Sequence, residues 1–569
     1  MPKVISSHKE FIVGLILTLS LLWPLFAAPY FTHHDDVQII RLYEMDKCFK
    51  DGQIPCRWVP DLGGLYGYPI FNYYAPLPYY FGELIYLLTN SLLFSVKVMF
   101  AVSFLGAYIF MYLFASKLWG KMGGSLAAIF FEFAPYHALD FYVRGAMGEM
   151  WAFLFFPAVC WTITRLAEKR SIVNLMLFGI SFAALITSHN LSTMIFLPVI
   201  AFWIILLFLK KMSYRFLWFC FFSLLIGLAL SAFYFLPMLV EKNLVHVDTT
   251  TSGYFSYTEH FKGFRKMFLD RSWGWGASVR EVPGGEKEGM SYQIGWVHLF
   301  GWLLAVISAK VLWRKNRWLS LVITLSSLVT LFFIFMVHPR SELLWRNIES
   351  LKYLQFPWRF LLLVIFFISF LSGSIFLLNI KRKNLLWVLL VIVVVALNFS
   401  YFRPEKFIYT DDKQLLSGQN WDRQIKRSIF DYLPIYAEEP PAELATSRYE
   451  ILTGTAKITD YKAGTNWFSF AANVEEHTII RLSQYYFPDW KILVDSKEAN
   501  VEYKNNSLGL MTLILGKGTY QIEGRLYDTL IRSVANVITL AGFWVSAVLF
   551  LISCGRVRKW LAYYRKRIN

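Results

Sequence analysis

Two adjacent carboxylates, Asp35 and Asp36, directly follow the first long apolar run of the sequence. Acidic side chains beside a membrane are energetically costly unless water or a partner compensates them. Such a pair can deprotonate a hydroxyl group as a general base, or it can help to hold a divalent cation. A solvated acidic cluster at the membrane surface is the simpler explanation when the pair is taken alone, and the sequence identifies no particular metal site.

The rest of the loop that follows the acidic pair is too rich in glycine, proline and tyrosine for a simple connector. Aromatic rings stack on sugar rings, and tyrosine hydroxyl groups hydrogen-bond to sugar hydroxyl groups. An aromatic belt at the membrane interface would account for the tyrosines, but not for the order Gly-Tyr-Pro. The loop therefore favours a carbohydrate site, whose candidate residues are Arg57, Trp58, Tyr68, Asn72, Tyr73 and Tyr74.

Arginine recurs in segments that we expect on the same side of the membrane, at Arg57, Arg144 and Arg359. Preorganised cations stabilise the negative charge that develops on a phosphate leaving group. Each arginine can alternatively extend its side chain towards lipid head groups. His189 lies at a tight turn between two apolar runs, and we interpret it as a structural cap.

The elements that position these residues are apolar helices. Hydrophobic residues make up 56% of the 569 residues and charged residues only 17%, with a mean hydropathy of +0.44. A membrane-spanning helix needs about 20 apolar residues. The segment 78–96 carries several polar residues and is interpreted as half-inserted; counting it as a span would give thirteen. The remaining runs predict twelve spans, at 11–30, 98–116, 122–137, 149–166, 172–188, 191–209, 214–237, 293–312, 318–336, 358–380, 384–400 and 529–553.

Basic residues predict the orientation of these spans, because cytoplasmic loops carry an excess of lysine and arginine. With a cytoplasmic N-terminus, six basic clusters fall on the cytoplasmic side, at 117–121, 165–170, 210–215, 310–317, 381–383 and 556–567. We therefore expect a multi-pass plasma-membrane protein with both termini in the cytoplasm. The net charge of +17 is spread over these short loops, which argues against a nucleic-acid partner.

Three regions follow from this topology. Residues 1–400 form a multi-span region with a first outer loop at 31–77, and residues 529–569 form a last helix with a basic cytoplasmic tail. Residues 401–528 form a linker and an outer domain, in which alternating apolar residues predict a small β-sandwich at about 447–527. Cys48 and Cys56 share the first outer loop and can form a disulfide in an oxidising compartment, although two free thiols fit equally.

Several motifs together resemble a known family. The first loop carries Asp51-Gly-Gln-Ile-Pro-Cys-Arg-Trp and Gly-Tyr-Pro-Ile-Phe-Asn-Tyr-Tyr, and later segments carry Arg144-Gly-Ala-Met-Gly-Glu, Gln355-Phe-Pro-Trp-Arg and Tyr485-Tyr-Phe-Pro-Asp-Trp. These motifs resemble bacterial membrane proteins labelled 6-pyruvoyl-tetrahydropterin synthase-related, which are similar to YfhO-like proteins and to GT-C glycosyltransferases. The ten histidines are scattered, which argues against pterin chemistry.

The GT-C resemblance implies a sugar transfer from a polyprenyl-phosphate donor on the extracytoplasmic face. The catalytic acid of that superfamily maps to Asp35 or Asp36, and a second acid maps to Asp140 or Glu149. The acceptor can be an envelope glycan, a lipid or a protein. A transporter or flippase of lipid-linked sugars is an alternative, although no internal repeat is evident. A non-catalytic subunit of envelope assembly is another.

Overall fold

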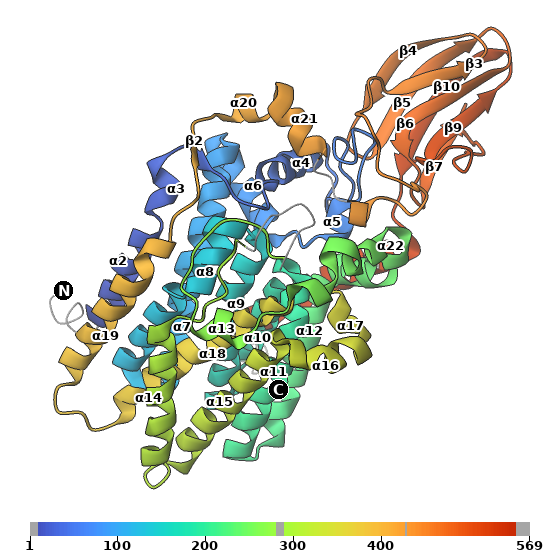
Figure 1. The fold of residues 1–569 in the computed structure, drawn as a ribbon. Coiled ribbons are helices and arrows are strands. Elements are labelled where there is room, and N and C mark those ends of the chain that lie inside the picture. Colours follow the sequence, from blue (N-terminus) through green and yellow to red (C-terminus); the bar gives the residue numbers. More distant parts are fainter. Residues whose placement is uncertain (1–8, 280–288, 427–429, 554–569) are drawn as a thin grey trace, which may run out of the picture.

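The computed structural model describes residues 9–279, 289–426 and 430–553, and the predicted basic tail lies outside them. Most of the chain is helical (Figure 1). Among the described residues, eight helical segments are long and apolar enough to cross a membrane. They are α7 (Leu92–Glu132), α9 (Met147–Glu168), α11 (Asn190–Lys211), α12 (Tyr214–Val240), α15 (Arg317–Val337), the segment Pro357–Leu377 around α18 (Leu361–Ser372), α19 (Lys383–Asn398) with its last turn to Tyr401, and α22 (Leu530–Ser553).

The remaining predicted spans correspond to shorter helices or to one half of a longer one. Apolar helices α10 (Ile172–Ser188) and α14 (Trp296–Leu312) are each 17 residues long, and α2 (Lys9–Leu21) has 13. The eight long helices confirm the membrane class of the fold. Neither the number twelve nor the direction of insertion follows from them, so both stay predictions.

Helix α7 contains two of the predicted spans, 98–116 and 122–137. Its continuity is interrupted at Gly120, which has a positive φ of 74°. Gly124 and Ser116 lie on opposite sides of this break and are in close contact, since a methyl group added to Gly124 would lie 1.9 Å from Ser116 Oγ. The chain therefore folds back here, and the two halves pack closely. Glycine suits this reversal because it adopts a positive φ without steric cost.

The polar segment 78–96 does not form one long helix. Helix α6 (Leu77–Thr89) has 13 residues and ends at Asn90, which adopts a left-handed conformation with φ 51°. At 1.5 Å per residue such a helix is about 20 Å long, which is shorter than the hydrocarbon core of a bilayer. Ser91 then caps the start of α7 by accepting a hydrogen bond from the Phe94 backbone N–H.

Helix α18 lies at the centre of the bundle. Every residue of Leu361–Ser372 is buried, and α18 contacts α7, α14 and α15. Small residues allow close approach in this region, as where a methyl group at Gly123 would lie 2.5 Å from the carbonyl oxygen of Gly373. On another side of the bundle α10 packs against α12, and α12 packs against α22.

Two antiparallel sheets form near the C-terminus, between the α19 end and α22. One has the order β4-β5-β10-β7-β8 and the other has the order β3-β6-β9. Side chains of β5 alternate between buried and more exposed, as the sequence pattern predicts for a half-buried strand. The strands are β3 (Tyr449–Thr453), β4 (Ala456–Ala463), β5 (Trp467–Val474), β6 (Thr478–Tyr485), β7 (Trp490–Val494), β8 (Lys497–Glu498), β9 (Leu510–Leu515) and β10 (Gly518–Leu526).

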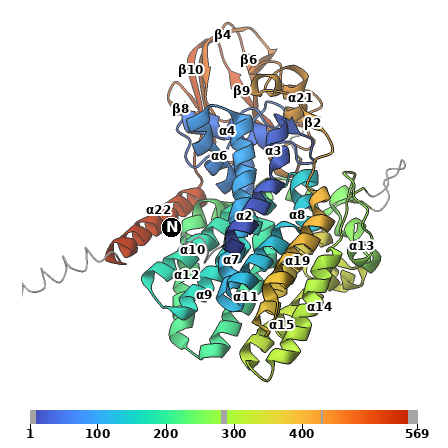
Figure 2. The same ribbon diagram turned by 90° about the vertical axis from the view of Figure 1, so that its left-hand side faces the viewer.

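The first loop connects these sheets to the helical bundle. It contains α4 (Gln38–Lys50) and the short α5 (Ile70–Tyr73), and Figure 2 shows the strands above α4 and α6. Asp51 accepts hydrogen bonds from the Thr465 N–H and hydroxyl groups, both at 2.7 Å, and from the Trp467 indole at 2.9 Å. A separate two-strand pair, β1 (Tyr30–Phe31) with β2 (Phe407–Ile408), joins the start of the first loop to the segment after α19.

Candidate functional site

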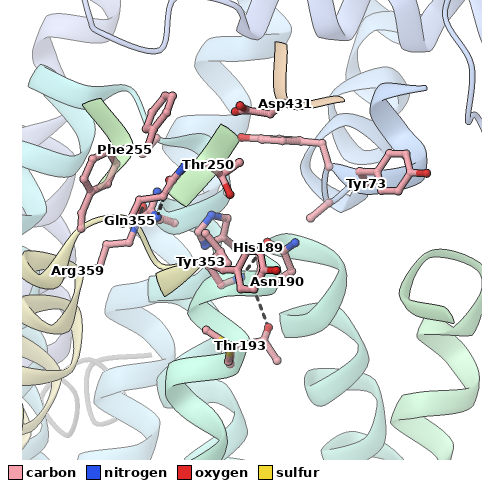
Figure 3. A pocket seen from close by; sticks show the side chains of 18 of the residues that line it. Tyr73, His189, Asn190, Thr193, Thr250, Phe255, Tyr353, Gln355, Arg359 and Asp431 are labelled. Atoms are coloured by element: carbon pink, nitrogen blue, oxygen red, sulfur yellow. Dashed lines mark hydrogen bonds and ion pairs between the residues drawn. The ribbon is translucent and has the colours of Figure 1, made fainter. Parts of the chain in front are cut away.

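A cavity of about 840 Å³ lies where the loops at one end of the bundle meet. Its walls come from the first loop, the segment before α9, the α10–α11 turn, the end of α12, the loop after α12 and the segment before α18. Figure 3 shows side chains from these elements converging on one space. Of the predicted site residues, it brings together Asp35, Tyr73, Tyr74, Arg144, Glu149 and Arg359.

Glu149 joins the two predicted arginines into one buried cluster. Its carboxylate accepts two hydrogen bonds from Arg144, both at 2.8 Å, and one from Arg359 Nε at 2.9 Å. Arg144 also pairs with Asp140, and Arg359 donates to the Leu354 carbonyl oxygen at 2.6 Å. The two guanidinium groups are thus fixed in place, as electrostatic stabilisation of a developing charge requires.

Local backbone structure explains how this cluster forms. The π-helical turn Leu139–Arg144 ends at Gly145, whose φ is 65°. That turn directs Arg144 back towards the first turn of α9, where Glu149 lies near the positive end of the helix dipole. Trp358 supports Arg144 from the other side, with the guanidinium carbon 4.6 Å from the centre of its ring.

Asp35 occupies the cavity wall beside this cluster. Its backbone N–H donates to the Arg144 carbonyl oxygen at 2.8 Å, which ties the first loop to the segment before α9. The carboxylate lies 3.7 Å from Arg41 Nη1 and accepts a hydrogen bond of 3.2 Å from Gln38. With 33% of its side chain exposed, Asp35 is accessible to a substrate hydroxyl group.

The other member of the acidic pair is placed differently. Among the described residues, Asp35 lines the cavity and Asp36 does not. Asp36 interacts instead with Tyr30, whose hydroxyl group also contacts His33 Nε2 at 3.0 Å. His34 lines the cavity and its ring bonds the Trp275 carbonyl oxygen at 2.7 Å, while burial lowers the pKa of His34.

Two tyrosines of the first loop face the cavity. The Tyr74 ring lies under Arg41, with the guanidinium carbon 4.1 Å from the ring centre. Tyr73 stacks on Tyr432 with the rings 6.0 Å apart and 4° from parallel, and its hydroxyl group donates to the Glu241 carbonyl oxygen at 2.8 Å. These contacts hold both rings at the cavity surface.

Arg57 and Asn72 lie outside the cavity lining, in a second polar cluster at the start of α22. Arg57 donates to Asn72 at 3.0 Å and to Asn536 at 2.8 Å. Asn72 donates to Glu241 at 2.9 Å, and Glu241 also pairs with Arg532 at 2.9 Å. This cluster connects the first loop, the end of α12 and α22, so its contacts are structural.

Trp58 and Tyr68 also lie outside the cavity lining. Trp58 is fully buried against Phe487 and Trp490 of the sheet region, with ring centres 5.6 and 5.9 Å away. Tyr68 is buried beside Tyr432, with its ring edge-on at 6.3 Å. The first-loop motif therefore holds the β-strand region in place through some residues and lines the cavity through others.

Comparison with known proteins assigns no family. No family model matches the chain. A protein of Lactococcus lactis subsp. cremoris (strain MG1363), described as uncharacterized, is 24% identical over 243 residues. The match covers 41% of this chain and 40% of that relative, so the chain spans less than half of the relative's length.

Sequence reasoning missed several residues of the cavity. His189 was interpreted as a cap, and its Nδ1 does accept a hydrogen bond from the Ser192 backbone N–H at 3.2 Å. It also lines the cavity near Glu149, and burial lowers the pKa of His189 to about 4. Because Nδ1 accepts from the backbone, the proton of the neutral ring sits on Nε2.

The cavity also has an apolar side, formed by α11 and α12. Met194 and Leu197 of α11 and Met238 and Leu239 of α12 line it. Leu197 is 45% exposed and Leu239 is 46% exposed, so this apolar side of the cavity is accessible. Lys242 follows α12 on this side, with its amine 5.7 Å from the centre of the Tyr353 ring.

No cluster of three or more histidine, cysteine, aspartate or glutamate side chains suited to a metal occurs in the described part of the chain. Two acidic residues near the cavity, Glu149 and Asp140, are instead paired with Arg144. The divalent cation considered from the sequence thus stays a prediction.

Proposed function

We propose that this protein is a membrane glycosyltransferase that moves a sugar from a polyprenyl-phosphate donor to an envelope acceptor on the extracytoplasmic face. One observation carries the proposal. A single cavity combines an accessible carboxylate, a pair of fixed guanidinium groups and an accessible apolar side formed by α11 and α12.

Each part of the cavity suits one part of that reaction. The polyprenyl chain lies along the apolar side formed by α11 and α12, where Leu197 and Leu239 are about half exposed. Its phosphate lies between Lys242 and the Arg144–Arg359 pair, where the ammonium group and the guanidinium N–H groups donate charge-assisted hydrogen bonds to phosphate oxygens. The sugar then lies towards Asp35.

The chemical step uses Asp35 as the general base. Its carboxylate removes the proton from the acceptor hydroxyl group, and the freed oxygen attacks the anomeric carbon of the donor sugar. The bond from that carbon to the phosphate oxygen breaks, and its electron pair leaves with the polyprenyl phosphate. Arg41 and Gln38 hold the carboxylate in position through contacts of 3.7 and 3.2 Å.

A mass-spectrometric profile of envelope glycans and polyprenyl-phosphate sugars tests this proposal. It compares the wild type, a deletion, Asp35→Asn and Asp36→Asn at equal expression levels. We expect Asp35→Asn to reproduce the deletion, with one glycan lost and its lipid-linked donor accumulated. Asp36→Asn is the matched control, because Asp36 lies beside Tyr30 and away from the cavity, and it should retain the glycan.

The same profile separates the proposal from transport. If Asp35→Asn retains the wild-type glycan, the base assignment is wrong and the proposed reaction loses its main support. A flippase or transporter of lipid-linked sugars would then account for the cavity better, because such a protein needs the binding groups but no base.

A further inference from the structure

One wall of the cavity comes from a segment outside the multi-span region. Asp431 and Tyr432 precede the first strand of the sheet region, and both line the cavity. Figure 3 shows Asp431 near Thr250 and Tyr73, and away from the labelled Arg359. In this position, the two residues would contact one part of a bound substrate and the arginines would contact another.

The loop after α12 holds this segment in place. Val245 forms a backbone bridge with Pro434, and the Ala437 carbonyl oxygen bonds the His246 ring at 2.7 Å. The Thr249 hydroxyl oxygen lies 2.5 Å from Asp431 Oδ1 and 2.6 Å from the His246 carbonyl oxygen, so its single hydrogen is shared between these two acceptors. The Asp431 carboxylate is therefore fixed through Oδ1, and Oδ2 is the oxygen that a ligand can use.

Aromatic rings continue this wall. Tyr432 stacks on Tyr73 and meets Tyr68 edge-on, while Tyr74 follows next to Tyr73. Flat aromatic faces pack against the C–H faces of sugar rings, and an adjacent carboxylate accepts hydrogen bonds from sugar hydroxyl groups. A lipid acceptor would need a continuous apolar wall here, whereas Asp431 and Thr250 place polar groups on this wall.

We infer that Asp431 and Tyr432, with the buried Tyr73 ring stacked on Tyr432 in support, form a subsite for a sugar ring of the acceptor, so that the acceptor is a carbohydrate rather than a protein or a simple lipid. The inference rests on the proposed function and names the substrate class of the same cavity. Asp431 is 6% exposed, and hydroxyl groups of a sugar that donate to its carboxylate would add to the contact with Thr249 and offset the cost of burying the charge.

The test uses membranes that contain the full-length protein and its lipid-linked donor. The acceptor is the glycan fraction isolated from the deletion strain, and mass spectrometry follows sugar transfer as the acceptor concentration varies. Asp431→Asn removes a charged hydrogen-bond acceptor and should raise the acceptor KM about ten- to a hundredfold. The donor KM should stay unchanged, which a general structural defect would not produce.

Two variants of Tyr432 separate ring stacking from folding. Tyr432→Leu should raise the acceptor KM. Tyr432→Phe retains the ring, so its acceptor KM should equal that of the wild type. Tyr436→Leu is the matched control, because Tyr436 belongs to the same segment but packs on Tyr486 and Tyr503 outside the cavity lining. It should leave the acceptor KM at the wild-type value.

Several outcomes overturn the inference while the proposed function stands. One is that Asp35→Asn is inactive but Asp431→Asn and Tyr432→Leu leave the acceptor KM unchanged. Another is that linkage analysis finds the transferred sugar on a protein side chain or directly on a lipid hydroxyl group. Activity of Asp35→Asn would instead overturn the proposed function itself.

Discussion

Replacement of Glu149 by glutamine tests the buried cluster most directly. Glu149 is 1% exposed and accepts three hydrogen bonds from the guanidinium groups of Arg144 and Arg359. The amide group of glutamine places an N–H donor against a guanidinium donor and removes the negative charge between two positive ones. Removal of one partner of a buried ion pair costs about 3–5 kcal/mol of unfolding free energy.

The assay is the unfolding free energy of the purified protein in detergent, measured by titration with sodium dodecyl sulfate and followed by circular dichroism. Glu168→Gln is the matched control, because Glu168 ends the same helix α9 and pairs with Lys117 at 2.7 Å on the surface. Its side chain is 47% exposed, and such surface pairs contribute about 0–1 kcal/mol. Glu149→Asp retains the charge and should fall between the two variants.

Equal unfolding free energies for Glu149→Gln and Glu168→Gln would refute this reasoning. That result would mean that water reaches the cluster and screens it as it screens a surface pair. The guanidinium groups would then not be preorganised, and the argument that they stabilise a phosphate leaving group would lose its physical basis.

Three further predictions concern the loops. Cys48 and Cys56 form a disulfide and are buried, so a thiol-specific maleimide should label them in detergent-denatured membranes only after reduction; labelling of the denatured protein without reduction would contradict this. Asp51→Ala should expose the β-strand region to limited proteolysis, because three hydrogen bonds to Thr465 and Trp467 are lost; an unchanged digestion pattern would count against the docking role. Between pH 6.5 and 4, His189 binds a proton in the unfolded chain but stays neutral in the folded protein. The unfolding free energy of the wild type, relative to that of His189→Gln, should therefore decrease as the pH is lowered from 6.5 to 4. Parallel pH profiles of the two proteins would contradict the assigned neutral ring.

The membrane class was predictable because it depends on local composition. Apolar runs such as 191–209 and 214–237 reappear as α11 and α12 with similar ends. The reversal at Gly120 lies between the predicted spans 98–116 and 122–137, where Lys117 and Lys121 interrupt the apolar stretch. The count of spans was harder to predict, because helices such as α2, α10 and α14 are shorter than 18 residues. Alternating residues also indicated the strand region correctly, since a half-buried strand has a period of two.

The candidate site was predictable only in part. Residue types and their order selected the pair Asp35 and Asp36 together with Arg144 and Arg359, and the structure brings Asp35 and both arginines into one cavity. The same reasoning also selected Trp58. Its aromatic side chain and its place in the first-loop motif are the same whether it contacts a sugar or the sheet region. Nothing in the order of residues separates those two environments, because burial depends on segments that are hundreds of residues away.

The sequence by itself determined that this protein lies in a membrane, where its helices approximately are and which kinds of side chain its loops carry. Hydropathy and side-chain chemistry are local properties, so they can be read without the tertiary structure. Tertiary structure alone decided which of two adjacent carboxylates faces the cavity and which arginines share Glu149. It also brought Asp431 and Tyr432, almost 400 residues after Asp35, into the same wall. The physical reason is that a cavity is formed by surfaces that pack in space, and their distances along the chain carry no information about that packing.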